Sequence, residues 1–278
     1  MFRQGLIKKY IDNGFEKNEA VAELDLIYEF VANFTVKDIL MGKELKKQQI
    51  SEITDIVQVR LSQRKPIQQI LGRSYFMGDV FFVNKHTLIP RPETELLVLE
   101  VLKNIKSDKQ YKILDIGSGS GCIAIEIAKH AINSVVTSVD VSFDALKIAK
   151  QNSKNLGVSE RVEFIESDLF SNVSGIFDII VSNPPYIPVK EKETLQQEVR
   201  DFEPHGALFA YDETGVEFYK NIIQHSKKYL KKGGFLLFEL GINQAEEVNI
   251  LMEKNGFCNV ILTKDFSGID RVISGCFI

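Results

Sequence analysis

The sequence predicts an α/β protein in which a small helical bundle, a β-hairpin and a doubly wound sheet of seven strands follow one another. Three observations lead to this prediction. Apolar residues in the first quarter of the chain recur at helical spacing. Two aromatic-rich runs around a Gly-Asp turn come next. Short apolar runs then alternate with amphipathic stretches, which is typical of a parallel sheet covered on both faces.

Residues 1–72 are expected to form the helical domain. Turn residues at Asn13-Gly14 and at Gly42 separate its amphipathic stretches. The apolar stripes, at spacings of three and four, are Leu6, Ile7, Tyr10 and Ile11, then Leu24, Ile27, Tyr28 and Val31, then Ile50, Ile53, Val57 and Leu61. The residues alone leave two roles open for this domain, which could support its neighbour or bind a partner.

Residues 73–90 are expected to form the hairpin that links the two domains. Pro92 then suits the first turn of a helix, where its missing N–H costs nothing. Glu93 and Glu95 suit the positive end of the same helix. Helix capping is therefore a sufficient role for this stretch.

Residues 91–278 are expected to form the sheet domain. Gly233-Gly234 is expected to end the helix that begins near Gly215. The segment 265–269 is too short for a helix, so we expect the last two strands to form a hairpin with an antiparallel final strand. The predicted strands span 111–116, 135–140, 162–166, 177–182, 235–240, 258–263 and 270–277.

A glycine-rich turn, Gly117-Ser118-Gly119-Ser120-Gly121, follows the first of these strands. Glycines between a strand and a helix allow a tight turn and a close approach of the backbone to a ligand. The dinucleotide fingerprint would need its third glycine at Cys122, so the spacing disfavours an NAD-dependent oxidoreductase. Asp140 closes the next strand, where an acid suits the two hydroxyls of a ribose.

A second motif, Asn183-Pro184-Pro185-Tyr186, follows the strand at 177–182. Two successive prolines cannot continue a strand ladder, so the chain must leave the sheet there. An amide, two rigid residues and an aromatic ring are thereby placed at the edge of the sheet where ligands bind in open α/β folds. Taken alone, the motif could be only a turn.

Composition excludes several classes of protein. The net charge of −4 lacks the basic footprint of a nucleic-acid binder. Three cysteines without a C-x-x-C pair argue against a zinc site and a disulfide framework, and fit the cytoplasm. We also expect no signal peptide, because the amino-terminal stretch is charged and amphipathic and lacks an unbroken apolar segment. No membrane span is expected either, because no apolar run approaches the roughly 20 residues that a bilayer requires.

Taken together, these motifs identify a family resemblance. The chain resembles the PrmC/HemK family of class I S-adenosylmethionine-dependent methyltransferases, which methylate a glutamine side-chain nitrogen of peptide chain release factors. The match covers nearly the whole chain. It implies that residues 1–72 form a substrate-docking domain and that Leu88–Glu95 lines the cofactor and substrate pocket. Besides the two motifs above, it rests on Pro66–Gly72, Leu88–Glu95 with its Pro-Arg-Pro-Glu-Thr-Glu run, Ser182–Ile187, Glu203-Pro204 and Phe238–Gly241.

The resemblance implies S-adenosylmethionine as the methyl donor, S-adenosylhomocysteine as the product and no metal. In the family, the position of Asp168 binds the adenine amine, and the next residue, often tryptophan, packs on the ring; here it is Leu169. Asp168 could otherwise be a turn acid, and Asp140 could serve the helix that begins at Ser142. The implied cofactor-binding residues are Gly117, Ser118, Gly119, Ser120, Gly121, Asp140, Asp168, Leu169 and Asn183.

The implied acceptor is the glutamine of the Gly-Gly-Gln motif in class I release factors, so that methylation would modulate translation termination. Substrate binding is assigned to Asn183, Pro184, Pro185 and Tyr186, of which the first two and Tyr186 are also catalytic. An amide nitrogen is a poor nucleophile, so two acceptors aimed at its N–H bonds would help it. The Asn183 side-chain oxygen and the Pro184 carbonyl can supply them, and Tyr186 can pack flat on the amide.

Two further functions remain to be weighed. An N6-adenine methyltransferase acting on DNA or RNA would use the same four residues, because adenine also presents a planar NH2 group, but it should add a basic groove. A non-catalytic binding module could share the fold. The intact motifs favour an enzyme, which the resemblance implies is a monomer in the cytoplasm that binds release factors and neither nucleic acid nor membrane.

Overall fold

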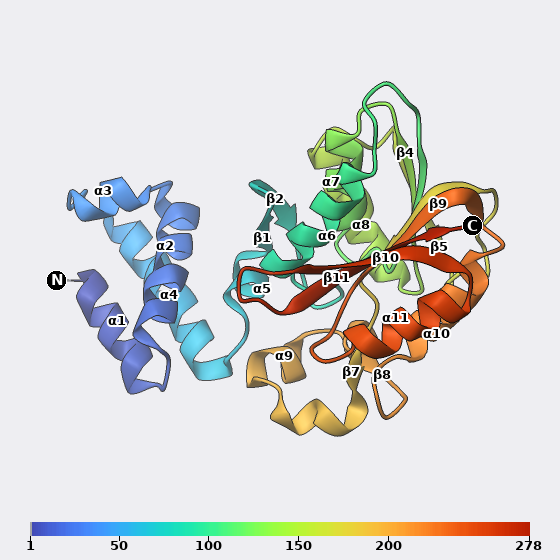
Figure 1. Ribbon diagram of the computed structural model, residues 1–278. Coiled ribbons are helices and arrows are strands. Elements are labelled where there is room, and N and C mark those ends of the chain that lie inside the picture. The colour runs from blue at the N-terminus through green and yellow to red at the C-terminus, as the bar shows by residue number, and fades with distance from the viewer. Residues whose placement is uncertain (1) are drawn as a thin grey trace. The chain divides into compact units, whose positions relative to one another are not determined.

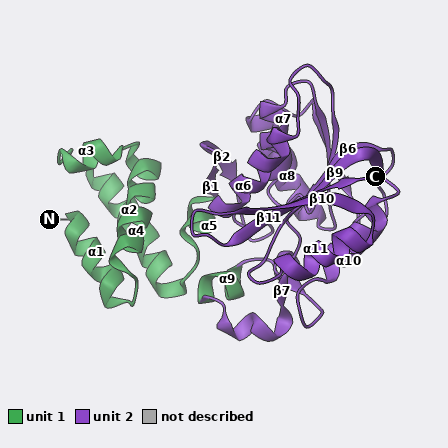
Figure 2. Ribbon diagram, viewed as in Figure 1, with its two compact units in different colours: residues 1–72, 197–202 green, residues 73–196, 203–278 purple. Residues whose placement is uncertain are grey.

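The computed structural model describes residues 2–278, which fall into two compact units (Figure 2). The smaller unit comprises the chain up to Gly72 together with Gln197–Phe202, and the larger comprises Arg73–Gln196 and Glu203–Ile278. Each unit has an apolar core of its own. A short segment from the second half of the sequence thus belongs to the unit formed mainly by the first quarter.

The smaller unit is helical, and the three predicted stripes lie on α1, α2 and α4. Their buried apolar side chains form one core with Ile67 and Leu71 of a short fifth helix. Two helices of five residues each, α3 and α5, are too short to show a periodic pattern. The helices are α1 (Phe2–Asp12), α2 (Lys17–Ala32), α3 (Val36–Leu40), α4 (Lys47–Gln63), α5 (Ile67–Leu71) and α9 (Gln197–Phe202).

Arg60 of α4 holds α9 in this unit. Its side chain is only 2% exposed and contacts Glu23 of α2 at 2.8 Å and Glu198 of α9 at 3.0 Å. A third carboxylate, Glu19, lies at 3.1 Å. Glu19 and Glu23 both belong to α2, so the Glu198 contact is the one that links Arg60 to α9. Removing either partner of such a buried pair would leave a charge uncompensated. The amide of Gln69 adds a bond to the Phe202 carbonyl, at 2.9 Å.

The larger unit contains the predicted seven-stranded sheet, in the order β10-β11-β9-β6-β3-β4-β5 (Figure 1). Strands β5, β4, β3, β6 and β9 are parallel, whereas β11 runs antiparallel to both β9 and β10, as the short connection predicted. The strands are β3 (Lys112–Ile116), β4 (Val135–Asp140), β5 (Val162–Glu166), β6 (Phe177–Ser182), β9 (Leu230–Glu239), β10 (Phe257–Lys264) and β11 (Asp270–Phe277).

Helices cover both faces of this sheet. Successive strand residues such as Ile113 and Leu114, which point to opposite faces, belong to two different apolar clusters. The first cluster contains residues of α6 (Pro92–Lys103), α7 (Cys122–His130) and α8 (Phe143–Asn155), and the second contains residues of α10 (Glu217–Ser226) and α11 (Ala245–Lys254). The hairpin of β1 (Arg73–Phe76) and β2 (Asp79–Phe82) packs Phe76 and Phe81 into the first cluster.

The structure corrects one predicted boundary. Helix α10 ends at Ser226, and Gly233-Gly234 lies inside β9 rather than after the helix. A Cβ atom on Gly234 would lie 2.7 Å from the Asp178 carbonyl oxygen, so this glycine permits a close approach to β6. The sequence also did not predict the two-residue strands β7 (Ile187–Pro188) and β8 (Phe209–Ala210) or the 3-10 helices η1 (Val189–Thr194) and η2 (His205–Ala207), which are too short for a pattern.

Candidate active site

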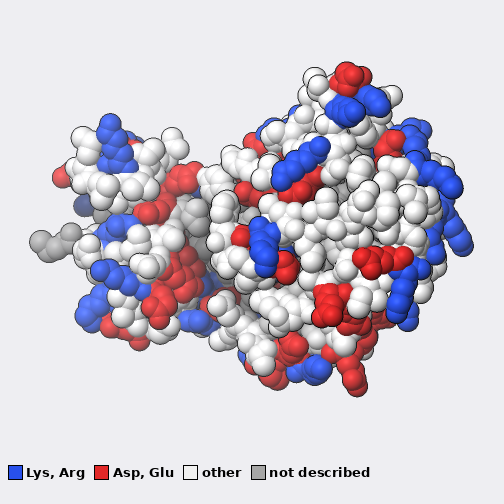
Figure 3. Space-filling model, in the orientation of Figure 1, with Lys and Arg blue, Asp and Glu red and all other residues white. Residues whose placement is uncertain are grey.

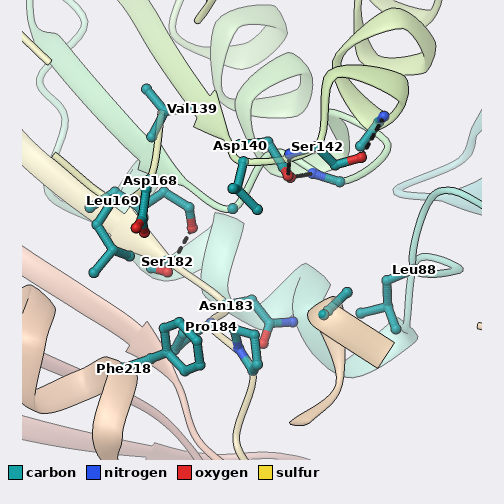
Figure 4. A pocket seen from close by; sticks show the side chains of 18 of the residues that line it. Leu88, Val139, Asp140, Ser142, Asp168, Leu169, Ser182, Asn183, Pro184 and Phe218 are labelled. Atoms are coloured by element: carbon teal, nitrogen blue, oxygen red, sulfur yellow. Dashed lines mark hydrogen bonds between the residues drawn. The ribbon is translucent and has the colours of Figure 1, made fainter. Parts of the chain in front are cut away.

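A pocket lies at the carboxyl ends of the parallel strands of the larger unit (Figure 4). The strand order reverses between β3 and β6, which is where open α/β sheets bind their ligands. Loops after β3, β4, β5 and β6 all reach this pocket. Of the sequence-predicted site residues, the lining includes Gly117, Gly119, Asp140, Asp168, Leu169, Asn183, Pro184 and Pro185.

The glycine turn is anchored to the neighbouring strand. The N–H groups of Gly117 and Ser118 both donate to the Val139 carbonyl, at 2.8 and 2.9 Å. Gly117, Gly119 and Gly121 all have positive φ angles, which residues with a side chain rarely adopt. A Cβ atom on Gly121 would also lie 3.0 Å from that of Ala149, so this glycine permits close packing of α7 against α8.

Two serines of the turn face away from the pocket lining. Ser118 is buried, and its hydroxyl lies 2.6 Å from the Ser138 hydroxyl, which donates to Asp115 at 2.7 Å. Burial raises the pKa of Asp115 to about 7, and the Ser138 hydrogen bond opposes the shift. Asp115 is fully buried and so organises the turn from beneath. Ser120 is buried too, and its carbonyl accepts from the Asn152 amide.

Asp140 connects the end of β4 to the glycine turn and to α8. One carboxylate oxygen accepts from the Gly119 N–H at 2.9 Å, and the other from the Ser142 N–H at 2.8 Å. Burial raises the pKa of this carboxyl, and its backbone N–H partners oppose the rise. Each oxygen keeps a further lone pair, so Asp140 can hold the helix start and still accept from a ribose. Its two possible roles are therefore compatible.

The position of Leu169 follows from an unusual backbone conformation. Its φ angle is +47°, which is uncommon for a residue with a side chain, and the Ser167 hydroxyl donates to its carbonyl at 2.9 Å. Leu169 and Asp168 both line the pocket (Figure 4). The Asp168 carbonyl also accepts from the N–H and hydroxyl of Ser171, so this residue serves a turn as well.

Asn183 lines the pocket beside Pro184 (Figure 4). Its amide nitrogen donates to the Thr94 hydroxyl at 3.2 Å, and that hydroxyl donates to Glu239 at 2.6 Å. The amide oxygen keeps its lone pairs to accept hydrogen bonds from a donor in the pocket. Thr94 and Glu239 are buried, and neither was predicted as a site residue.

Tyr186 is half-buried behind the pocket and is not among the lining residues. Its carbonyl accepts from the Gln244 amide at 2.9 Å, and its side chain packs against the second apolar cluster. Packing of its ring on an acceptor amide therefore stays a prediction. Glu203 directly precedes the pocket-lining residue Pro204 in the sequence. It pairs with Arg91 and accepts from the Ile89 N–H, which makes it a structural residue.

Several apolar residues complete the pocket lining, and of these Leu88 alone belongs to a stretch that was expected to line it. Phe218 and Ile222 share one face of α10, and their spacing of four was the available signal. Leu88, Val139 and Ala207 add further apolar surface from three separate segments. Apolar walls with a few convergent polar groups are characteristic of a pocket for a small molecule.

The lining fits a nucleoside with a charged tail. The N–H groups of Gly117, Ser118, Gly119 and Gly121 already donate within the protein, so a carboxylate would be received by the first turn of α7. Asp140 has the acceptor capacity for a ribose. Leu169 and Phe218 can bury an aromatic base. Within residues 2–278, no three or more His, Cys, Asp or Glu side chains are grouped so that they could hold a metal ion. No helix in that range combines the length and the apolar composition of a membrane span.

Fold and site together define a methyltransferase of class I, and comparisons with known proteins agree. The sequence model of the protein family described as the methyltransferase small domain matches residues 93–210. A 16S rRNA N2 G1207 methyltransferase (RsmC) of T. thermophilus, solved with AdoMet and guanosine, is similar at a TM-score of 0.54 and 14% identity, covering 74% of this chain and 50% of that one.

Curated relatives identify the family. The release factor glutamine methyltransferase of Fusobacterium nucleatum is 42% identical over 84% of this chain and 66% of its own length, slightly less than two thirds. That of Flavobacterium psychrophilum is 40% identical over 93% of this chain and 92% of its own length. The chain belongs to the release factor glutamine methyltransferase family.

Proposed function

We propose that this protein transfers a methyl group from S-adenosylmethionine to the side-chain amide nitrogen of the glutamine in the Gly-Gly-Gln motif of class I peptide chain release factors. The observation that carries the proposal is the Asn183 amide, whose nitrogen is bonded to Thr94 so that its oxygen can accept. An oxygen held in this way can accept a hydrogen bond from one of the two N–H groups of a substrate amide. The names of the curated relatives support the same acceptor.

The cofactor site is assigned to the larger unit. Gly117, Gly119 and Asp140 would hold the amino-acid tail and the ribose, whereas Asp168 and Leu169 would hold the adenine. Ser118, Ser120 and Gly121 would contribute by shaping the turn. When bound, the cofactor supplies a methyl group made electrophilic by its sulfonium charge.

The remaining chemistry falls to the protein. The Asn183 oxygen and the Pro184 carbonyl accept the two N–H bonds of the glutamine amide, which holds its nitrogen in position. The same acceptors stabilise positive charge that develops on the nitrogen. Pro184 and Pro185 keep the loop rigid, because a proline ring fixes φ. The apolar walls of the pocket exclude water.

The assembly required is small. All residues assigned to the reaction lie in Arg73–Gln196 and Glu203–Ile278 of one chain. One copy can therefore hold the whole reaction site, and we further propose that it acts alone, in the cytoplasm and without a metal ion. We assign the docking of the release factor to the smaller unit, residues 1–72, whose exposed side chains include Val36, Leu40 and Met41.

Methylation of an adenine in nucleic acid is the alternative. On the face in Figure 3, lysines and arginines occur in small groups separated by acidic and uncharged side chains. The net charge of −4 agrees with that distribution. A nucleic-acid substrate is expected to require a basic track. These features support a protein acceptor instead.

One experiment separates the two. The protein is incubated with methyl-labelled S-adenosylmethionine and, in parallel, with a release factor, with DNA and with RNA. We expect label in the release factor alone, with mass spectrometry locating a gain of one CH2 group on the glutamine of its Gly-Gly-Gln loop. A factor carrying glutamate there should remain unlabelled, since a carboxylate has no nitrogen. Label on nucleic acid, or on another residue, would contradict the proposal.

A further inference from the structure

Asn183 belongs to a hydrogen-bonded chain that runs away from the pocket. Its amide nitrogen donates to the Thr94 hydroxyl at 3.2 Å, and Thr94 donates to a carboxylate oxygen of Glu239 at 2.6 Å. Thr94 lies in the first turn of α6 and is 3% exposed, while Glu239 ends β9 and is 1% exposed. Three separate segments of the larger unit thus meet behind one amide group.

The charge of Glu239 decides the direction of each bond in this chain. An ionised carboxylate can only accept hydrogen bonds, so the Thr94 proton must point to Glu239. The Thr94 oxygen can then only accept from Asn183, which turns the amide nitrogen toward Thr94. The amide oxygen is thereby directed to the opposite side, toward the glutamine amide of the substrate. Reversing any one bond would reverse the amide.

We propose that Thr94 and Glu239 are positioning residues that fix which end of the Asn183 amide faces the substrate. This inference rests on the proposed function, since a glutamine amide requires an oxygen at that point and is repelled by an NH2 group. Neither residue needs to touch the substrate. They act through Asn183 by excluding the flipped orientation of its side chain.

The surroundings of Glu239 make the device sensitive to pH. Burial raises the pKa of its carboxyl to about 7, the Thr94 hydrogen bond and Arg271 lower it, Glu93 raises it and Arg91 lowers it. Its charge also affects three groups that are neutral near pH 7, namely the half-buried Tyr186 and the buried Tyr219 and Cys122. The carboxyl is therefore ionised above about pH 7 and protonated below it.

Protonation permits the reverse order of donors. A protonated Glu239 can donate to the Thr94 oxygen. The Thr94 hydroxyl can then donate to the amide oxygen of Asn183, provided that the Asn183 amide has flipped. The NH2 group of Asn183 would face the NH2 group of the substrate. Because two donors cannot bond, turnover should fall as the pH decreases through about 7.

Kinetics provide the first test, with kcat measured from about pH 6 to about pH 9. We expect an acidic limb in the wild type that disappears in Glu239→Gln, whose side chain does not titrate. Thr94→Val should lower kcat by roughly tenfold to a hundredfold and leave cofactor affinity unchanged, and Thr94→Ser should restore most of the rate. A limb that persists unchanged in Glu239→Gln would overturn the proposal.

Glu126 supplies a matched control. Burial raises the pKa of this carboxyl to about 7 as well, with Glu95 adding to the rise. Its side chain is fully buried in α7 and is not among the pocket-lining residues. Glu126→Gln should therefore keep the acidic limb. Loss of the limb in this variant would assign it to Glu126 and contradict a role for Glu239.

Nuclear magnetic resonance tests the chain without any substrate. The side-chain NH2 signal of Asn183 is identified in labelled wild-type protein by its absence from Asn183→Asp. We expect it to shift with pH, with a midpoint near 7, and to lose that dependence in Thr94→Val and Glu239→Gln. A pH-independent signal in the wild type would overturn the proposal. If the signal titrates but no glutamine is methylated, the proposed function fails and the positioning chain stands.

Discussion

The nitrogen and the oxygen of the Asn183 side-chain amide have different roles. The nitrogen is held by the protein, and the oxygen is directed to the acceptor. The motif itself could be predicted from the sequence, because two prolines after an apolar run must end a strand. Its partners could not, since Thr94 and Glu239 are separated by 145 positions and only the folded sheet brings them together. The one signal for Glu239 in the sequence was an acidic residue within the otherwise apolar run Phe235–Leu240.

Replacing Asn183 should separate catalysis from cofactor binding. Asn183→Ala removes one of the two acceptors for the substrate amide, so we expect kcat to fall by about a hundredfold to a thousandfold. The affinity for S-adenosylmethionine, measured by calorimetric titration, should change much less, because the lost bond acts mainly in the transition state. Undiminished turnover would remove Asn183 from the proposed mechanism.

Asp140→Ala should weaken cofactor binding by roughly 1.5 to 3 kcal/mol, the scale of a hydrogen bond to a charged group. Part of this loss should come from the Gly119 and Ser142 N–H groups, which lose their acceptor. Asp144→Ala, four residues further on in α8, offers a control, since that carboxylate is half exposed and pairs with Lys147. Calorimetric titration measures the cofactor affinity of both variants and of the wild type. An affinity of Asp140→Ala equal to that of the wild type would contradict the ribose assignment.

Among the elements, the loop after β6 depends on two glycines and a glutamine. A Cβ atom on Gly215 would lie 2.1 Å from the Tyr186 carbonyl oxygen, and one on Gly241 would lie 2.5 Å from a Gln244 oxygen. Gln244 itself bonds the carbonyls of Tyr186 and Thr214, at 2.9 Å each. The backbone behind the pocket therefore leaves no space for a side chain, which also explains the Phe238–Gly241 signature.

Gly215→Ala should consequently displace Tyr186 and impair turnover by more than tenfold, on the scale of a small misplacement of reacting groups. Gly233→Ala is the matched control, because both glycines have a φ of +77° but a Cβ atom on Gly233 meets no atom within 4 Å. Both variants bear the same backbone strain, whereas only the first should lower kcat. Equal kcat values would show that the loop tolerates the displacement.

The strands were the most predictable elements, since buried parallel strands are short, continuous apolar runs such as Phe177–Ser182. The start of β9 was missed because Lys231-Lys232-Gly233-Gly234 resembles a helix end in composition. There the backbone approaches β6 closely at Gly234, a tertiary contact that local composition does not indicate. The segment between β7 and β8 was missed because two-residue strands carry no periodic signal.

At the scale of the whole molecule, the division into two units predicts separable activities. Deleting residues 1–72 should preserve cofactor affinity, because no pocket-lining residue lies among them. Methylation of an intact release factor should fall further than methylation of a short peptide that carries the Gly-Gly-Gln loop. Circular dichroism should first establish that the shortened protein is folded, since α9 loses Arg60 in it.

A folded deletion variant that methylates the intact factor at the full rate would refute a docking role for the smaller unit. Full-length Glu198→Gln provides a companion variant, since it weakens the link between Arg60 and α9 while retaining every helix of that unit. If α9 matters only as part of the docking unit, this substitution should affect the intact factor and spare the peptide.

The place of β11 has a consequence for how the protein is made. This strand follows β9 and β10 along the chain yet lies between them in the sheet. While the nascent polypeptide emerges from the ribosome, the edge of β9 that pairs with β11 lacks this partner until Asp270–Phe277 has been synthesised. An unpaired edge invites aggregation, so the growing chain is most vulnerable just before the sheet is completed. Its safe production should therefore depend on chaperones during that interval.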